Sequence, residues 1–279
     1  MEDAELLAAL TGGRAPAARI VLCTVVDSAG SVPQKPGARL AVAAGGRIAG
    51  TIGGGAIEKL AVETARAMLA EGGCRLLSPH LTRDLGMCCG GRVTVFLQTI
   101  EPAETLLLFG AGHIARPLSA RAGELGFSVV VVDERAEWAS RERFPGAARI
   151  EVEPPLDAID ALPFDARTSI CVVTHDHRLD QEIVEACLPR PWRYLGVIGS
   201  RRKAALFRER LLAKGFPRER VEAIHGPMGL AIGAQTPEEI AISICAELIA
   251  VRHAAAAGRE QAAPPAPLSL PAGEGQGVG

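Results

Sequence analysis

Residues 106–115 read Leu-Leu-Leu-Phe-Gly-Ala-Gly-His-Ile-Ala, and the architecture of the second half of the chain follows from them. An apolar run of this length is typical of a buried parallel strand, and the G-x-G-x-x-A pattern after it is typical of the turn that opens a dinucleotide-binding helix. Gly110 permits the tight turn, Gly112 lets backbone approach a phosphate at the helix N-terminus, and Ala115 lets helix and strand pack closely. A glycine turn without any ligand is the alternative.

An acidic residue supports the same interpretation. Asp133 follows the apolar run Val129–Val132 and lies 23 residues after Gly110. A carboxylate at the end of the second strand of such a domain binds the ribose hydroxyls of NAD. The residue therefore predicts NAD rather than NADP, if a nucleotide binds at all.

The pattern around this run alternates between strands and helices, which predicts a doubly wound parallel sheet, a Rossmann-like α/β domain. The strands are expected near 105–109, 128–132, 148–152, 169–174 and 194–198, and the helices near 112–125, 179–188, 200–214 and 236–253.

The preceding part of the chain is expected to form a smaller α+β domain with strands at 19–26, 38–43, 47–51 and 92–98 and a helix at 55–70. Three segments are predicted: a domain over 1–102, a Rossmann-like domain over 103–254, and a disordered tail over 255–279. The tail is rich in Ala, Pro and Gly, so it has little apolar surface to offset its ordering entropy.

The carboxyl ends of the first and fourth strands of a doubly wound sheet flank its ligand crevice. The fourth strand ends in Thr174-His175-Asp176-His177, which we expect to face Gly110 and His113. A metal site and a plain polar lining of the crevice are both compatible with these side chains. The fifth strand ends in Gly199-Ser200, which predicts an anion cradle or, alternatively, a helix cap.

Two glycine motifs lie in the smaller domain. Gly53, Gly54 and Gly55 open a helix that carries Glu58, so their amides are candidates for an anion site, with a structural turn as the alternative. The motif lacks the Gly-Lys-Ser/Thr ending of a P-loop, so the sequence gives no support for ATP hydrolysis. Cys88-Cys89-Gly90-Gly91 places two thiols beside flexible backbone, where a soft metal centre or a simple turn is expected.

Composition excludes several classes of function. The 279 residues are 48% apolar but only 4% aromatic, and the formal net charge is −2. Without aromatic platforms or a basic run, a nucleic-acid partner is not expected.

No run approaches the roughly 20 apolar residues of a membrane span. The acidic N-terminus does not fit a signal peptide, so a cytoplasmic protein is expected. The seven scattered cysteines do not predict a disulfide framework.

Together these motifs resemble the XdhC/CoxI family of xanthine dehydrogenase accessory proteins. The resemblance spans about residues 5–253 and is carried by Gly30-Ser31-Val32-Pro33, Gly50–Gly55 with Glu58, Cys89-Gly90-Gly91, Gly110-Ala111-Gly112-His113, and Gly226-Pro227 through Ala246-Glu247. It implies an XdhC/CoxI domain followed by a Rossmann domain, assembled as a homodimer.

The resemblance also implies a role as a chaperone that binds molybdenum cofactor (molybdopterin), assists its sulfuration and inserts it into a molybdenum hydroxylase such as xanthine dehydrogenase. A cysteine desulfurase is the implied sulfur donor. Cys89 is the candidate molybdenum contact and Cys88 the second choice. The implied cofactor-binding residues are Gly53, Gly54, Gly55, Glu58, Cys89, Gly90, Gly91, Gly110, Gly112, His113, Asp133, His175, Gly199, Ser200, Gly226 and Pro227.

Two rival functions remain open from the sequence. The first is an NAD-dependent oxidoreductase, which Gly110, Gly112 and Asp133 favour and which the single tyrosine, Tyr194, disfavours because no tyrosine-lysine pair is evident. The second is an adaptor that bridges desulfurase and target enzyme without touching the cofactor.

Overall fold

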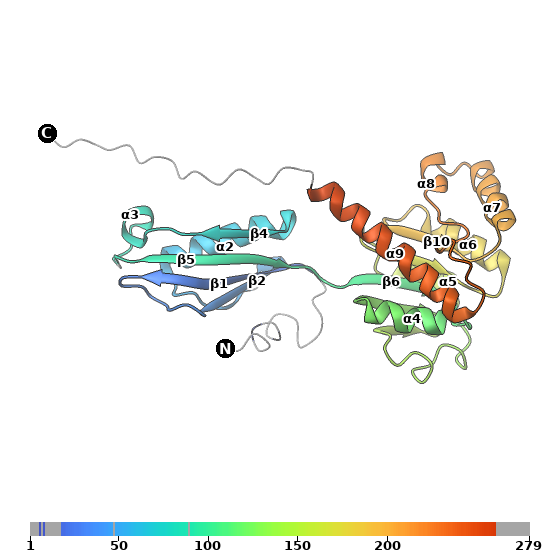
Figure 1. The fold of residues 1–279 in the computed structure, drawn as a ribbon, viewed down its shortest axis with the longest axis horizontal. Coiled ribbons are helices and arrows are strands. Elements are labelled where there is room, and N and C mark those ends of the chain that lie inside the picture. Colours follow the sequence, from blue (N-terminus) through green and yellow to red (C-terminus); the bar gives the residue numbers. More distant parts are fainter. Residues whose placement is uncertain (1–5, 7, 9–17, 47, 89, 261–279) are drawn as a thin grey trace. The chain divides into compact units, whose positions relative to one another are not determined.

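The computed structural model describes the chain except residues 1–5, 7, 9–17, 47, 89 and 261–279. The chain divides into two compact units, Met1–Ala103 and Glu104–Gly279 (Figure 1). Each buried core cluster draws its residues from one of these units.

The described part of the first unit contains an antiparallel sheet and the long helix α2 (Gly55–Glu71). The five strands follow the order β3-β2-β1-β5-β4, and α2 contacts β1, β2 and β5. The strands are β1 (Ile20–Ala29), β2 (Arg39–Ala43), β3 (Ile48–Gly50), β4 (Cys74–Leu77) and β5 (Arg92–Ile100).

Helix α2 forms because its apolar residues recur at helical spacing. Ile57, Ala61, Ala65 and Met68 are each fully buried and lie on one face, as a spacing of three or four residues requires. They pack on the alternate residues Val21, Cys23 and Val25 of β1, whose side chains point to the same side of the sheet, in one core cluster.

The second unit is a parallel sheet in the order β10-β9-β6-β7-β8, which is the doubly wound order 5-4-1-2-3 within this unit. The strands are β6 (Glu104–Phe109), β7 (Phe127–Val132), β8 (Arg149–Glu151), β9 (Ser169–Val172) and β10 (Tyr194–Val197). This confirms the Rossmann-like fold expected from the sequence.

Helices cover both faces of this sheet, so its strands are apolar on both sides. Leu106 and Leu108 of β6 belong to the cluster under α4 (Ala115–Glu124) and α9 (Pro237–Glu260), whereas Leu107 and Phe109 belong to the opposite one. The opposite cluster lies under α5 (Pro155–Ala158), α6 (His177–Cys187), α7 (Arg201–Ala213) and α8 (Arg218–Glu222).

The strands and long helices expected from the sequence are present, with shifted ends. The short elements β4, α3 (Leu81–Leu85), α5 and α8 were not predicted, because four or five residues carry too little periodicity. Helix α9 continues to Glu260 through the helix-forming run Ala254–Ala257, so helix extends past the expected domain end at 254. The remaining tail residues, 261–279, lie outside the described part. None of the described helices is long and apolar enough to cross a membrane.

Candidate functional site

The turn after β6 is shaped by two glycines with different roles. Gly110 has φ +101° and donates its N–H to the carbonyl of Val132 at 2.8 Å; a Cβ on it would lie 2.7 Å from the carbonyl oxygen of Val173. Close approach of β6 and β9 therefore requires this glycine. A Cβ on Gly112 would meet nothing within 4 Å, so open space adjoins the second glycine.

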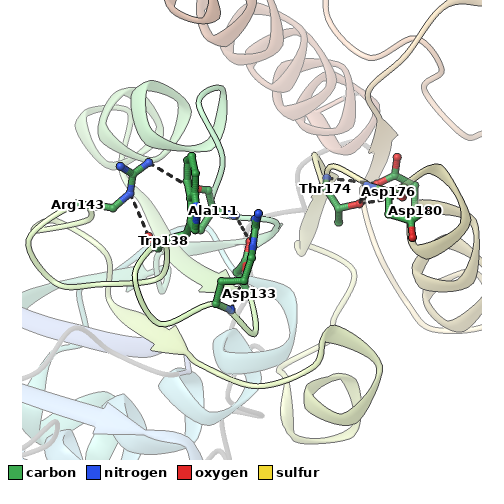
Figure 2. Close-up of polar contacts among 8 residues, drawn as sticks. Ala111, Asp133, Trp138, Arg143, Thr174, Asp176 and Asp180 are labelled. Atoms are coloured by element: carbon green, nitrogen blue, oxygen red, sulfur yellow. Dashed lines mark hydrogen bonds and ion pairs between the residues drawn. The ribbon is translucent and has the colours of Figure 1, made fainter.

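Asp133 lies against this turn with all its acceptor sites engaged (Figure 2). Its Oδ2 accepts from the Ala111 N–H at 2.8 Å and from Arg135 Nη2 at 2.6 Å, and its Oδ1 accepts from the Arg135 N–H at 3.0 Å and Nε at 2.8 Å. Burial raises the pKa of this carboxyl, but the Arg135 and Ala111 hydrogen bonds outweigh burial and hold the pKa below its ordinary value. The charged carboxylate braces the glycine turn.

An aromatic and cationic group lies beside the same turn. Arg143 donates from Nε to the Trp138 carbonyl at 3.1 Å and from Nη2 to the Ala111 carbonyl at 3.4 Å (Figure 2). Its guanidinium lies 4.6 Å from the Trp138 ring centroid, the Arg135 guanidinium lies 5.2 Å from it, and His113 meets the ring edge-on at 5.3 Å. Sequence reasoning identified His113 but not Trp138 or Arg143, which no motif marks.

The carboxyl end of β9 is organised by a buried ion pair. Asp180 is fully buried and accepts from the Thr174 hydroxyl at 2.6 Å and from Lys203 Nζ at 2.6 Å. Asp176 caps α6 by accepting the Arg178 N–H at 2.7 Å. His175 and His177 are exposed. Among the described residues no three His, Cys, Asp or Glu side chains are grouped so that they could hold a metal ion.

The carboxyl end of β10 leads into a capped helix. Ser200 accepts the Lys203 N–H at 3.2 Å as the N-cap of α7. A Cβ on Gly199, whose φ is +149°, would lie 2.5 Å from Cδ of Lys203, the residue whose ammonium reaches Asp180. Helix capping therefore accounts for the serine at position 200, and the close packing of Lys203 accounts for the glycine at position 199. The anion cradle at these residues stays a prediction.

The loop that contains Gly226 and Pro227 is attached to the edge of the sheet. His225 bridges to Gly196 of β10, and the Gly226-Pro227 peptide bond is cis. The Glu247 carboxylate of α9 joins His225 Nδ1 at 3.0 Å and accepts from the Tyr194 hydroxyl at 2.6 Å and the Gly229 N–H at 2.7 Å. This partly buried network explains why the loop stays beside β10.

Three loops of the first unit converge at one end of its sheet. The Gly91 N–H donates to the Ser31 carbonyl at 3.1 Å, and a Cβ on Gly91 would lie 2.6 Å from that same oxygen. A Cβ on Gly53 would lie 2.7 Å from Cγ of Pro33, and one on Gly55 would lie 3.3 Å from Cε of Met87. The glycine motifs of this unit therefore form one candidate site.

The Glu58 side chain, in the first turn of α2, binds the glycine-rich loop before that helix. Its Oε2 accepts from the Thr51 hydroxyl at 2.5 Å, the Gly54 N–H at 3.1 Å and the Ile52 N–H at 3.2 Å. Burial raises the pKa of the Glu58 carboxyl, but these hydrogen bonds outweigh burial and lower the pKa. The chain thus supplies its own anion to two of the amides there.

Of the two neighbouring cysteines, Cys88 lies in the described part of the chain and Cys89 does not. Cys88 is exposed within the convergent loops, and Gly90 beside it is exposed as well. Cys89, the preferred molybdenum contact, lies outside the described residues. The remaining described cysteines are Cys74, which is exposed in β4, and Cys23, Cys171, Cys187 and Cys245, which are buried.

The structure brings the predicted residues together in two places, one in each unit. Gly53, Gly55, Glu58 and Gly91 belong to the first, and Gly110, Gly112, His113 and Asp133 to the second. A family model described as the XdhC Rossmann domain matches residues 106–248, and one described as the XdhC and CoxI family matches residues 14–78.

The chain belongs to the XdhC family. The resemblance inferred from the motifs is thereby confirmed.

Two relatives and one solved structure similar to this XdhC-family chain carry names that refer to xanthine dehydrogenase or molybdenum cofactor. A protein of Bacillus subtilis strain 168, named as a probable xanthine dehydrogenase subunit, is 35% identical over 62% of this chain, which spans 48% of that relative's length. A protein of Escherichia coli K12 named molybdenum cofactor insertion chaperone PaoD is 24% identical over 83% of each chain. A crystal structure described as a xanthine dehydrogenase from Bacillus halodurans is similar with a TM-score of 0.53 and 25% identity, covering 95% of this chain and 98% of that one.

Proposed function

We propose that this XdhC-family chain binds molybdenum cofactor as cargo and assists its insertion into a molybdenum hydroxylase. Family membership supports this proposal, as do the names of two relatives, a molybdenum cofactor insertion chaperone and a component of a xanthine dehydrogenase. A carrier of this kind acts by binding and release, so it needs an accessible site rather than a set of catalytic groups.

The convergence of three glycine loops, one of which contains Cys88, is the observation that carries the proposal. Gly91 packs against Ser31, Gly53 against Pro33 and Gly55 against Met87, and the exposed Cys88 directly follows Met87. Molybdenum is thiophilic, and soft metals prefer sulfur ligands. In this proposal Cys89 contacts the metal, with Cys88 as the alternative.

The donor set of this loop cluster sets a limit on how the cargo is held. Glu58 already accepts the amides of Ile52 and Gly54, so a phosphate would have to displace that carboxylate to use them. We therefore assign the thiols and Gly90 to the metal end of the cargo, and Glu58 to shaping the loop beside it.

We extend the proposal with finer parts that the resemblance to the family supports. The chain receives sulfur for the cofactor through a cysteine desulfurase, acts as a homodimer in the cytoplasm, and serves xanthine dehydrogenase or a related enzyme.

Gel filtration of the full chain with molybdenum cofactor tests the proposal. Wild type should retain molybdenum in the protein peak, and Cys89→Ala should reduce retention at least about tenfold because a metal–thiolate contact is lost. Cys74→Ala is the matched control, since this exposed thiol lies in β4. If wild type never retains molybdenum, the proposal fails; if Cys88→Ala alone abolishes retention, the neighbouring thiol is the contact.

A dehydrogenase is the less supported function. Tyr194 is fully buried and donates its hydroxyl to Glu247, so it is not placed to transfer a proton to a substrate. Asp133, which would bind the ribose of NAD, is fully engaged by Ala111 and Arg135.

A further inference from the structure

Arg143 is a half-buried cation without a counter-charge. Its two hydrogen bonds go to the neutral carbonyls of Trp138 and Ala111, and no carboxylate lies within ion-pair distance of it among the residues that the structure describes. Burying part of a cation costs free energy unless an anion or hydrogen bonds compensate it. The carbonyls provide hydrogen bonds but no negative charge.

Asp133, the acid that binds the same turn, cannot provide that charge. The Asp133 carboxylate, 4% exposed, binds the Arg135 guanidinium in a bidentate ion pair and the Ala111 N–H as well. The charges of Arg135 and Asp133 compensate each other within that ion pair, so Asp133 has no further charge to offer Arg143, which bonds to the turn through the Ala111 carbonyl.

Because these hydrogen bonds occupy the Asp133 carboxylate, they also change which ligand the turn can recognise. A carboxylate at this position selects NAD by accepting the two ribose hydroxyls. Each Asp133 oxygen already accepts two hydrogen bonds. Ribose hydroxyls would therefore have to compete with a guanidinium, a stronger donor than a hydroxyl because it is charged.

Space for a ligand lies next to this charge. A side chain on Gly112 would meet nothing within 4 Å, and the Arg143 guanidinium bonds to the carbonyl of the adjoining Ala111. Stacking on Trp138 at 4.6 Å fixes the plane of the guanidinium, which preorganises its fork of N–H donors.

We propose that Arg143 makes the turn after β6 selective for a ligand that carries a phosphomonoester, and that Asp133 does not act there as a ribose acceptor. An Arg fork matches the geometry of phosphate oxygens, and a dianion provides the ion-pair partner that Arg143 lacks among the described residues. Two sources carry this chemistry: the 2′-phosphate of NADP and the terminal phosphate of a molybdopterin. The inference does not depend on the function proposed above, because either ligand satisfies it.

Fluorescence titration of the full chain with two matched ligand pairs tests the inference. NADPH and NADH differ only in the 2′-phosphate, and the fluorescent oxidised pterin prepared from molybdenum cofactor is used with and without its phosphate. In at least one pair the phosphorylated form should bind about tenfold tighter or more. Preference in the first pair assigns the site to a dinucleotide, and preference in the second assigns it to the pterin.

Variants of Arg143 then assign the preference to this residue. Arg143→Gln should reduce the preference to less than about threefold, whereas Arg143→Lys, which keeps the charge, should retain most of it. Arg141→Gln is the matched control, since its guanidinium bonds to the Ala147 carbonyl instead of the glycine turn. Circular dichroism of each variant shows that it is folded.

Three results would overturn the inference: equal affinity within both pairs, no binding of either phosphorylated form, or an unchanged preference in Arg143→Gln. Failure here is distinguishable from failure of the proposed function. Molybdenum retention depends on the thiols of the first unit, so that experiment can succeed when Arg143 proves irrelevant, and the reverse also holds.

Discussion

Single carboxylates hold the two glycine turns of this protein in shape. Glu58 binds the loop before α2, and Asp133 binds the turn after β6. Both are charged at neutral pH because hydrogen bonds to the ionised form outweigh the effect of burial on the pKa. Their effects on stability and on ligand choice are therefore testable one residue at a time.

Replacing Glu58 by Gln should destabilise the first unit by about 1 kcal/mol at pH 7, since charge-assisted hydrogen bonds become neutral ones and the site is partly exposed. The folded pKa of Glu58 lies below its ordinary value of 4.5, so its contribution is present above that value and is lost as the pH falls through the folded pKa. Urea unfolding at a series of pH values should show the wild type and E58Q converging in acid. A difference that grows in acid would contradict this assignment.

Replacing Arg135 by Ala should release Asp133 for ribose hydroxyls. NADH affinity is then expected to increase about tenfold, because a carboxylate freed of a guanidinium can accept the two hydroxyls. Fluorescence titration measures the change, and Arg141→Ala serves as the control for loss of a nearby positive charge. Unchanged NADH affinity in the presence of a folded variant would show that Asp133 does not face the ligand.

At the scale of elements, the close approach of β6 and β9 depends on Gly110 but not on Gly112. Gly110→Ala should cost at least about 2 kcal/mol of unfolding free energy, because its φ is +101° and a Cβ would lie 2.7 Å from the Val173 carbonyl oxygen. Gly112→Ala should change stability by less than about 0.5 kcal/mol, because its Cβ enters open space. Urea denaturation compares the pair. Equal losses in both variants would contradict the distinct roles.

The whole molecule consists of two units with separate cores, so each should fold alone. Residues 1–103 and 104–279, produced separately, are expected to show cooperative unfolding and the far-UV circular dichroism of an α/β protein. The described core residues of each unit lie within its own boundaries. An isolated unit that is unfolded at 25 °C would show that its stability depends on the other.

Long apolar runs made most of the fold predictable. The parallel sheet follows from four-residue runs such as Val129–Val132, which are buried from both faces and therefore carry no polar alternation. The family followed from glycine motifs, because turns with positive φ restrict the residue type strongly. The short elements α3, α5, α8 and β4 were not predictable, since their few residues are held by neighbours rather than by their own pattern.

The sequence by itself determined the order of the longer elements, the two units and the positions of the glycine turns, because local periodicity and glycine requirements are properties of the chain itself. Only the tertiary structure decided what the charged residues do. Asp133 matched a ribose acceptor by position, yet Arg135 engages it, and Arg143 reaches the carbonyl of Ala111, 32 residues away. A carboxylate's role depends on which donors surround it in space, and spacing along the chain does not specify that.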